Sequence, residues 1–252
     1  MVKKIVLGLA LIGLVFSAGL ASAQGLNDMN LVTEQYPPYN FEQDGNLQGI
    51  SIDYLVQALQ QAGSDLGRSD IRLLPWAKGY DMALNQPGTL LFATTRTEQR
   101  EELFKWAGPI APTKISLVAK KDSNVRIDNL SDIMDKDYTI GVIRDDVGEQ
   151  LLKEGGVPDG NIDAVAKAVL NIKKLDRGRI DAWAYEENVA MWLIKSNGFD
   201  PGNFEPVYEL EKAELFYAFH KDTPQDTVNK LQNALDAVKQ GGKYDQILDT
   251  YR

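Results

Sequence analysis

The chain has 252 residues, of which none is cysteine and one is histidine, and its formal net charge is -9 at pH 7. A chain of this length forms one large domain or two lobes of about 100 residues each. The lack of cysteine excludes disulfides, thiolate nucleophiles and cysteine-based metal sites, while the acidic balance argues against nucleic acid or an anionic membrane as the main partner.

Residues 1–23 have the sequence features of a secretory signal peptide. The basic segment MVKK precedes the apolar run IVLGLALIGLVF, which is shorter than a membrane-spanning helix requires. After it, Ala21-Ser22-Ala23 fits a signal-peptidase site. We expect cleavage after Ala23; the alternative is an uncleaved anchor helix. An exported protein without cysteine for a lipid anchor or for disulfides fits a bacterial periplasm best, so the expected location is periplasmic.

Strand and helix patterns alternate over the next part of the chain. Apolar runs predict three strands, at 27–33, 71–74 and 89–94. Helical spacing of apolar residues predicts one helix at 49–63, with Ser51 as a candidate cap, and a second from 77 to about 85. This order predicts a small α/β lobe with right-handed crossovers.

The same alternation then repeats. Further strands are predicted at 115–121, 137–143 and 181–186. Further helices are predicted at 130–135, 144–156, 169–180 and 187–198. These segments predict a second α/β lobe.

A strand at 213–221 and a helical segment at 222–251 complete the chain. His220 ends the alternating pattern of that strand just before a turn, which predicts a strand-end surface residue rather than a catalytic or zinc-binding one. Pro224 is expected to be the first helical residue, and Gly241-Gly242 to break the helix. Because no low-complexity linker occurs, we expect strands or short hinges to join the lobes.

Four stretches in this order carry a resemblance to a known family. They are YPPYNFEQDGNLQGISIDYLVQAL, TRTEQREELFKWAGPI, YTIGVIRDDVGEQLLKEGG and GRIDAWAYEENV. The chain resembles the type 2 periplasmic solute-binding proteins, and within them the family 3 extracellular solute-binding proteins, the polar amino acid receptors of ABC importers. The resemblance covers nearly all of the chain after the predicted signal peptide.

The resemblance implies a two-lobed fold in which each lobe is a central, mostly parallel sheet flanked by helices. Lobe 1 would comprise residues 24–112 and 212–252, and lobe 2 residues 113–211. The ligand would lie in the cleft between the lobes, where open α/β sheets bind ligands beyond the carboxyl ends of their strands. The implied protein is a monomer without cofactors that closes on a small carboxylate by a hinge motion and delivers it to a membrane ABC permease.

The resemblance also implies a carboxylate-binding corner after the strand at 89–94. Arg100 matches the arginine that forms a two-pronged pair with the ligand carboxylate, and its planar guanidinium suits that role. The alternative is a surface residue paired with Glu98, Glu101 or Glu102. Thr95 matches a position whose hydroxyl and N–H bind the ligand carboxylate. Arg96 departs from the usual small or apolar residue, and it is either an added ligand contact or a lobe-surface residue.

Four more ligand contacts are implied. Tyr36 and Trp76 match positions that place aromatic rings on the two faces of the ligand, although core packing is the alternative. In lobe 2, Arg144 lies where a strand leads into a helix N-terminus, which can bind an anion. Glu186 matches the acid that receives the α-ammonium group of an amino acid; the alternative is a solvated first-turn acid.

Other functions remain open from the sequence. We find no nucleophile motif, phosphate-binding loop or metal cluster, so we expect no catalytic residues, no metal ligands and no enzyme activity, with a dehydratase or lyase on the same fold as the less favoured alternative. A periplasmic sensor module is a second alternative, and a receptor for a carboxylate other than an amino acid is a third.

Overall fold

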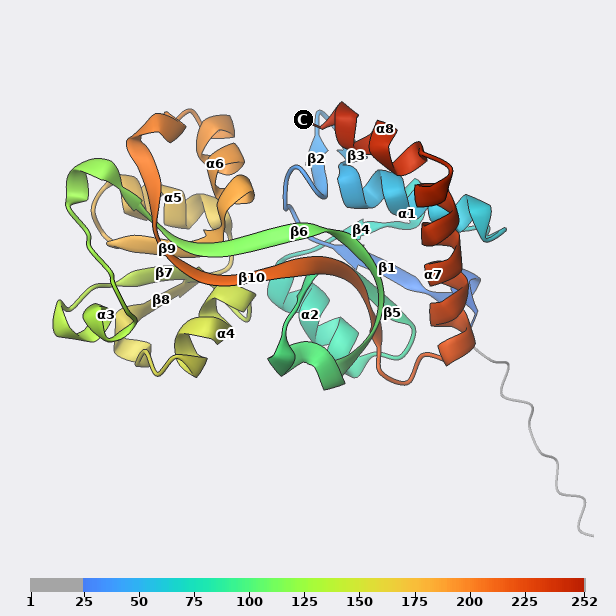
Figure 1. Cartoon of the computed structure of the whole chain (residues 1–252), viewed down its shortest axis with the longest axis horizontal. Helices are drawn as coiled ribbons and strands as arrows, with labels where there is room; N and C mark the ends of the chain where they lie inside the picture. The colour runs from blue at the N-terminus through green and yellow to red at the C-terminus, as the bar shows by residue number, and fades with distance from the viewer. Residues whose placement is uncertain (1–24, 252) are drawn as a thin grey trace, which may run out of the picture.

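The computed structural model describes residues 25–251, so the predicted signal peptide lies outside the described residues. Two α/β lobes lie side by side and are joined by two long strands, β6 (Phe104–Lys120) and β10 (Phe204–His220), which run across both (Figure 1). The two strands pair antiparallel along their whole length. The predicted fold class, α/β with two lobes, is confirmed.

In the first lobe, three parallel strands lie beside the long pair. Their order is β4-β1-β5, with β4 at Arg72–Leu73, β1 at Asn30–Thr33 and β5 at Thr89–Arg96. Every residue of β5 from Thr89 to Thr95 is buried, as its continuous apolar run predicts. The helices of this lobe are α1 (Ile50–Gln61), α2 (Trp76–Asn85), α7 (Gln225–Gln240) and α8 (Lys243–Thr250), with α7 and α8 packed on α1.

In the second lobe, β6 is followed in the sheet by β9 (Ala182–Glu186), β7 (Ile140–Ile143) and β8 (Ile162–Val165). β7 pairs parallel with both of its neighbours. The helices of this lobe are α3 (Ser131–Asp135), α4 (Val147–Glu154), α5 (Ala168–Asp176) and α6 (Glu187–Ser196). The carboxyl ends of β1 and β5 in one lobe and β7 and β9 in the other point toward the space between the lobes, which positions the site.

The strands that the sequence predicts at 115–121 and 213–221 are parts of β6 and β10, which are much longer. Near the middle of this pair, Thr113 is opposite Ala213 and Lys114 is opposite Lys212. The predicted lobe boundaries fall at these positions, so both crossings lie side by side. None of the helices within residues 25–251 has the length and apolarity that a membrane span requires.

Several local predictions were wrong. The first strand begins at Asn30 because residues Leu26–Asp28 form a 3-10 turn, and the hairpin of β2 (Phe41–Gln43) and β3 (Asn46–Gln48) was missed, as was β8. Pro224 has extended backbone angles and is the N-cap of α7 rather than its first residue. His220 is buried at 3% exposure, where its Nδ1 accepts a hydrogen bond from the backbone N–H of Asp222 at 3.1 Å.

The start of α1 shows why Ser51 does not cap it. The N-cap is Gly49, whose φ of 127° only glycine adopts readily, and a Cβ there would lie 2.3 Å from the carbonyl oxygen of Tyr39. Ser51 lies inside the helix, and its hydroxyl donates to that same carbonyl at 2.7 Å. This close approach fixes the segment from Tyr36 to Asn40 against the helix and therefore positions the aromatic residues of the cleft.

Candidate functional site

A fully buried arginine is the centre of the interface between the lobes. Arg100 follows β5 on a 3-10 helix, Glu98–Leu103, and is 0% exposed. Its Nε donates to Gln150 Oε1 of the other lobe at 2.8 Å and its Nη1 donates to the carbonyl of Thr95 at 3.2 Å. Nη2 is buried and has no hydrogen-bond partner among the described residues. Burial lowers the pKa of Arg100, yet a guanidinium stays charged, so this donor is suited to an anionic group.

Two stacked rings lie against this guanidinium. Trp76 and Tyr80, one turn apart at the start of α2, have ring centroids 5.5 Å apart and an interplanar angle of 25°. The Cζ atom of Arg100 is 5.3 Å from the Trp76 ring and 5.1 Å from the Tyr80 ring. The indole Nε1 of Trp76 donates to the carbonyl of Asp145 in the other lobe at 2.8 Å. The rings therefore hold Arg100 in place and also connect the lobes.

Two acidic residues from different lobes lie near Arg100. Glu34 directly follows β1, and burial raises the pKa of its carboxyl well above the ordinary value; the charge of Asp146 raises it further, whereas Arg100 opposes the shift. Asp146 is the N-cap of α4, and its Oδ1 accepts from the N–H of Val147 at 2.7 Å. Its Oδ2 is buried without a partner among the described residues. Burial raises the pKa of Asp146 to about 6, against the attraction of Arg100.

Tyrosine side chains from both lobes meet beside these acids. Tyr36 and Tyr185 pack edge to face with ring centroids 5.5 Å apart, and both are buried. Tyr185 also stacks on Trp183 at 4.5 Å, and its hydroxyl is a buried group without a partner among the described residues. Among the described residues, the cluster around Arg100 therefore has a cationic donor, a carboxylate oxygen and a hydroxyl without hydrogen-bond partners.

Glu186 is a buried cap rather than a solvated acid. It is the last residue of β9 and the N-cap of α6, with Oε2 accepting from the N–H of Val189 at 2.6 Å and Oε1 accepting from Asn188 Nδ2 at 3.1 Å. Burial raises its pKa to about 7, although these donors act in the opposite direction. Its charge also raises the pKa of Tyr36, so Glu186 lies close to the cluster.

A pocket of about 530 Å³ opens between the lobes next to the cluster. Glu34 and Trp76 line it from the first lobe, and Ile143, Tyr185 and Trp192 line it from the second. Its walls are mainly apolar and aromatic with few polar groups, and its size suits a small molecule. Glu34 and Lys167 give its walls both signs of charge, and Arg100 lies against Trp76.

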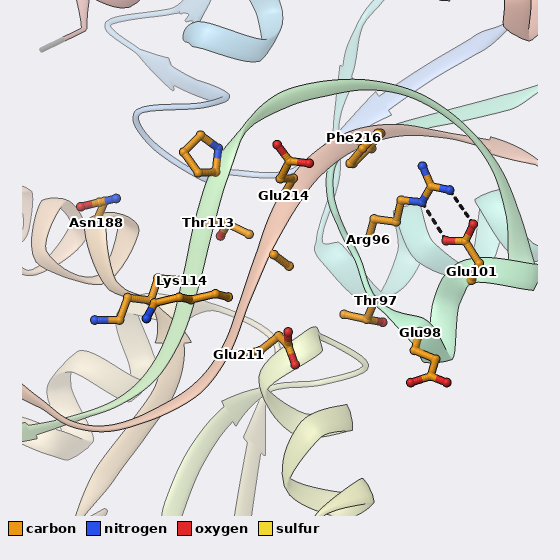
Figure 2. A pocket seen from close by; sticks show the side chains of 13 residues that line it. Arg96, Thr97, Glu98, Glu101, Thr113, Lys114, Asn188, Glu211, Glu214 and Phe216 are labelled. Atoms are coloured by element: carbon orange, nitrogen blue, oxygen red, sulfur yellow. Dashed lines mark hydrogen bonds and ion pairs between the residues drawn. The ribbon is translucent and has the colours of Figure 1, made fainter.

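Arg96 lies in a different place. Its guanidinium pairs with Glu101 through Nε at 2.7 Å and Nη2 at 2.5 Å, and it packs over Phe216. Figure 2 shows this pair beside the two crossing strands, in an open groove of about 910 Å³. On the other side of the groove Lys114 pairs with Glu187 at 3.0 Å. Because these charges are already paired with each other, the groove is a weaker candidate for an ionic ligand despite its size.

The structure brings five of the seven predicted site residues together. Tyr36, Trp76, Thr95 and Arg100 form the cluster and Glu186 lies beside it. Arg96 is paired in the groove, and Arg144 is exposed, with its backbone N–H bonded to the carbonyl of Val165. These ligand contacts all stay predictions, and the geometry supports those of the cluster.

Sequence reasoning missed Glu34, Asp146, Tyr80 and Tyr185. The signal for Glu34 was its place directly after the first strand, at the edge where α/β sheets bind ligands. The signal for Asp146 was an acid immediately before a helix, in the corner where the sequence favours Arg144. Within residues 25–251 no group of three or more acidic or histidine side chains is arranged to hold a metal ion.

The sequence matches a known protein family and a curated relative. The family profile described as bacterial extracellular solute-binding proteins, family 3, matches residues 30–252. A probable histidine-binding protein of Neisseria gonorrhoeae is 23% identical over 220 residues, which are 86% of this chain and 80% of that protein.

Solved structures share the fold. The arginine-, lysine-, histidine-binding protein ArtJ of Geobacillus stearothermophilus has a TM-score of 0.71 at 21% identity, over 88% of this chain and 94% of that chain. A histidine kinase sensor domain with similarity to periplasmic binding proteins has a TM-score of 0.76 at 18% identity, over 88% of this chain and 95% of that chain. The likeness to these two proteins is one of fold.

Proposed function

This chain belongs to the bacterial extracellular solute-binding proteins, family 3, and on that premise we propose that it captures a polar amino acid in the cleft around Arg100 and delivers it to an ABC importer. Proteins of this family and the neighbours in structure are binding proteins, so no catalytic step is proposed. The word extracellular in the family description supports export. We propose that the predicted signal peptide directs the chain to the periplasm, where it acts as a monomer.

The observation that carries the proposal is the unpartnered Nη2 of Arg100. A fully buried guanidinium with an unused donor is costly unless an anion binds to it, and a carboxylate matches its planar geometry. Thr95 and the rings of Trp76 and Tyr80 hold the guanidinium in position, so little ordering is needed when the carboxylate binds. The ligand carboxylate therefore lies at Arg100.

The acids of the cluster favour an amino acid with a cationic side chain. Glu34, Asp146 and Glu186 supply three carboxylates against one arginine. A ligand with one carboxylate, an α-ammonium group and a second cationic group leaves the fewest buried charges without compensation. The names of the relatives, which mention histidine, arginine and lysine, support the same class.

Closure by a hinge is proposed at the two crossings, near residues 112–116 and 209–215. Contacts such as Trp76 to Asp145 and Arg100 to Gln150 join residues of the two lobes, so a ligand that touches both lobes favours their closed arrangement.

A thermal-shift screen tests the function. The protein is unfolded and refolded to remove any bound ligand, then screened against amino acids and simple carboxylates. A ligand at 100 times its Kd adds about 2.7 kcal/mol to the free energy of unfolding. We expect the largest rise in Tm with arginine, lysine or histidine, and a response confined to simple carboxylates would contradict an amino acid receptor.

Glu186→Gln tests the proposed ammonium contact. We expect at least tenfold weaker binding of the amino acid, because glutamine removes the charge opposite the α-ammonium while it keeps an oxygen to accept from Val189. Binding of a simple carboxylate of similar size serves as the control and should change less than twofold. Equal losses for both ligands, measured by calorimetry, would remove the ammonium role.

A sensor is the second candidate, because a histidine kinase sensor domain shares the fold at a TM-score of 0.76. Uptake of the ligand by cells that lack this protein separates the two functions. A receptor for an importer is required for uptake at low ligand concentration, whereas loss of a sensor leaves the transport step itself intact.

A further inference from the structure

Gln150 is a polar residue of the second lobe that reaches the buried guanidinium of the first. It lies on α4 and is half-buried, and its Oε1 accepts from Arg100 Nε at 2.8 Å. The amide nitrogen of the same side chain, Nε2, donates to the carbonyl of Asp145 at 3.1 Å. These two bonds fix the orientation of the amide, with its oxygen toward a guanidinium that has only donors to offer.

The carbonyl that orients Gln150 is itself fixed between the lobes. The indole Nε1 of Trp76, in the first lobe, donates to the same Asp145 oxygen at 2.8 Å. The N–H of Asp145 donates to Glu149 Oε2 at 2.6 Å, and the φ of Asp145 is 61°, a left-handed conformation that aspartate tolerates. Both lobes therefore contribute to one connected set of hydrogen bonds, and Gln150 links this set to Arg100.

The hydrogen bonds of Arg100 leave one edge of its guanidinium for a ligand. A guanidinium has a side edge, formed by Nε and Nη2, and an end edge, formed by Nη1 and Nη2, and either edge can bind a carboxylate with two parallel hydrogen bonds. Gln150 occupies Nε and therefore blocks the side edge. The carbonyl of Thr95 accepts from Nη1 at 3.2 Å, which leaves the second hydrogen of Nη1, and Nη2 has no hydrogen-bond partner among the described residues.

We propose that Gln150 holds Arg100 as the lobes close, so that the ligand carboxylate binds the end edge, Nη1 with Nη2. This inference rests on the proposed function and makes Gln150 a positioning residue for it. Because Gln150 lies in the second lobe and Arg100 in the first, Nε is held only while the lobes are together. Recognition of the carboxylate and closure of the lobes are therefore coupled through this hydrogen bond.

Two substitutions at Gln150 test different parts of the proposal. Gln150→Met keeps the length of the side chain but offers Nε no strong acceptor, so a buried cationic donor loses its partner in the closed protein. Gln150→Glu keeps an acceptor and adds a negative charge, and its second oxygen can turn to Nη2 and occupy the whole side edge of Arg100. The matched controls are Gln99→Met and Gln99→Glu, which make the same changes at the exposed residue just before Arg100.

Isothermal titration calorimetry at pH 7 with L-arginine and L-argininamide measures the effect on binding. The amide has the same side chain and α-amino group but no carboxylate. We expect Gln150→Met to weaken binding of L-arginine roughly tenfold. Gln150→Glu should lower the preference for L-arginine over L-argininamide roughly 100-fold, because its carboxylate competes with that of the ligand for Arg100. In both Gln99 variants the affinity and the preference should change less than about threefold.

Stopped-flow fluorescence divides the effect of Gln150→Met between the two rate constants. Because the hydrogen bond to Arg100 forms only when the lobes meet, its loss should speed dissociation of L-arginine roughly tenfold and change association less than about threefold. Slower association with unchanged dissociation would contradict a contact that acts in the closed arrangement.

NMR of the Arg100 side chain separates this proposal from the proposed function. Without added ligand, we expect the Nε–H of Arg100 to exchange with water roughly tenfold faster in Gln150→Met than in wild type or in Gln99→Met. Equal exchange rates in all three proteins would overturn the hydrogen bond on which the proposal depends.

The two experiments together have distinct outcomes. Binding of L-arginine that depends on Arg100 but that neither Gln150 variant alters would overturn the proposal and leave the receptor function intact. Exchange that depends on Gln150, in a protein that binds no amino acid, would retain the link between the lobes and overturn the receptor function, and with it the place of the carboxylate.

Discussion

Arg100→Ala is expected to weaken amino acid binding at least 100-fold. Truncation of one member of a buried charge pair costs about 2–5 kcal/mol in binding, because the partner charge is left in a site without water. In this protein the loss would fall on the ligand carboxylate, since Arg100 Nη2 has no hydrogen-bond partner among the described residues. Isothermal titration calorimetry with the ligand found in the screen measures the effect.

Two comparison variants make this result specific. Arg96→Ala removes an arginine four positions earlier whose guanidinium is already bidentate with Glu101, and we expect less than a twofold change in affinity. Arg100→Lys keeps the charge but not the planar guanidinium, so its affinity for the ligand should lie between those of wild type and Arg100→Ala. A loss at Arg96 as large as that at Arg100 would place the ligand in the groove by the crossing strands and contradict the site described above.

The alternation of apolar strands and amphipathic helices was enough to predict two α/β lobes. β5 was recognisable because each of its residues from Thr89 to Thr95 is buried, which requires an almost unbroken apolar run. The full length of β10 was not predicted, because none of its residues from Glu205 to Glu214 is buried. In the middle of β10, residues such as Glu209 and Glu211 are partly exposed on both faces, so the sequence there carries no periodic pattern.

The site could be predicted in part for a similar reason. Arg100 and Trp76 could be predicted because both match positions of the resembled family. In the structure Arg100 follows a buried strand and Trp76 begins a helix, at the sheet edge where α/β folds bind ligands. Arg144 was favoured over Asp146 because a helix N-terminus attracts anions and an acid there is usually a simple cap. That Asp146 is also buried near Arg100 of the other lobe depends on how the lobes meet, and no local pattern contains that information.

The free energy of unfolding is expected to increase as the pH falls from 8 to about 5. Burial raises the pKa of Glu186 from 4.5 to about 7 and that of Asp146 from 3.8 to about 6. At a pH between its unfolded and folded pKa values, each acid binds more protons in the folded state than in the unfolded state. The free energy of unfolding therefore falls as the pH rises through this range, and the contribution of each acid is complete only below its unfolded pKa. For each acid, the free energy of unfolding is about 3 kcal/mol higher below its unfolded pKa than above its folded pKa. Because much of this change falls between pH 5 and pH 8, we expect a Tm roughly 10 °C higher at pH 5 than at pH 8.

Other acids set the lower end of this range. Partners on the surface lower the pKa values of three other acids, Glu101, Asp132 and Glu209. Their contribution to the free energy of unfolding is therefore present at neutral pH and is lost only as the pH falls below the ordinary carboxyl range. The maximum of stability should therefore lie near pH 5.

Glu186→Gln provides the control for the pH dependence, because it removes one titrating group and keeps a cap for α6. The variant should gain stability at pH 8 and show a flatter dependence of Tm on pH, measured by calorimetry in the absence of ligand. If the variant kept the wild-type dependence of Tm on pH, ionisation of Glu186 would not destabilise the folded protein. The argument that the buried acids favour a cationic ligand would then lose Glu186. The same experiment with Asp146→Asn then reports how much of the pH dependence of Tm comes from Asp146.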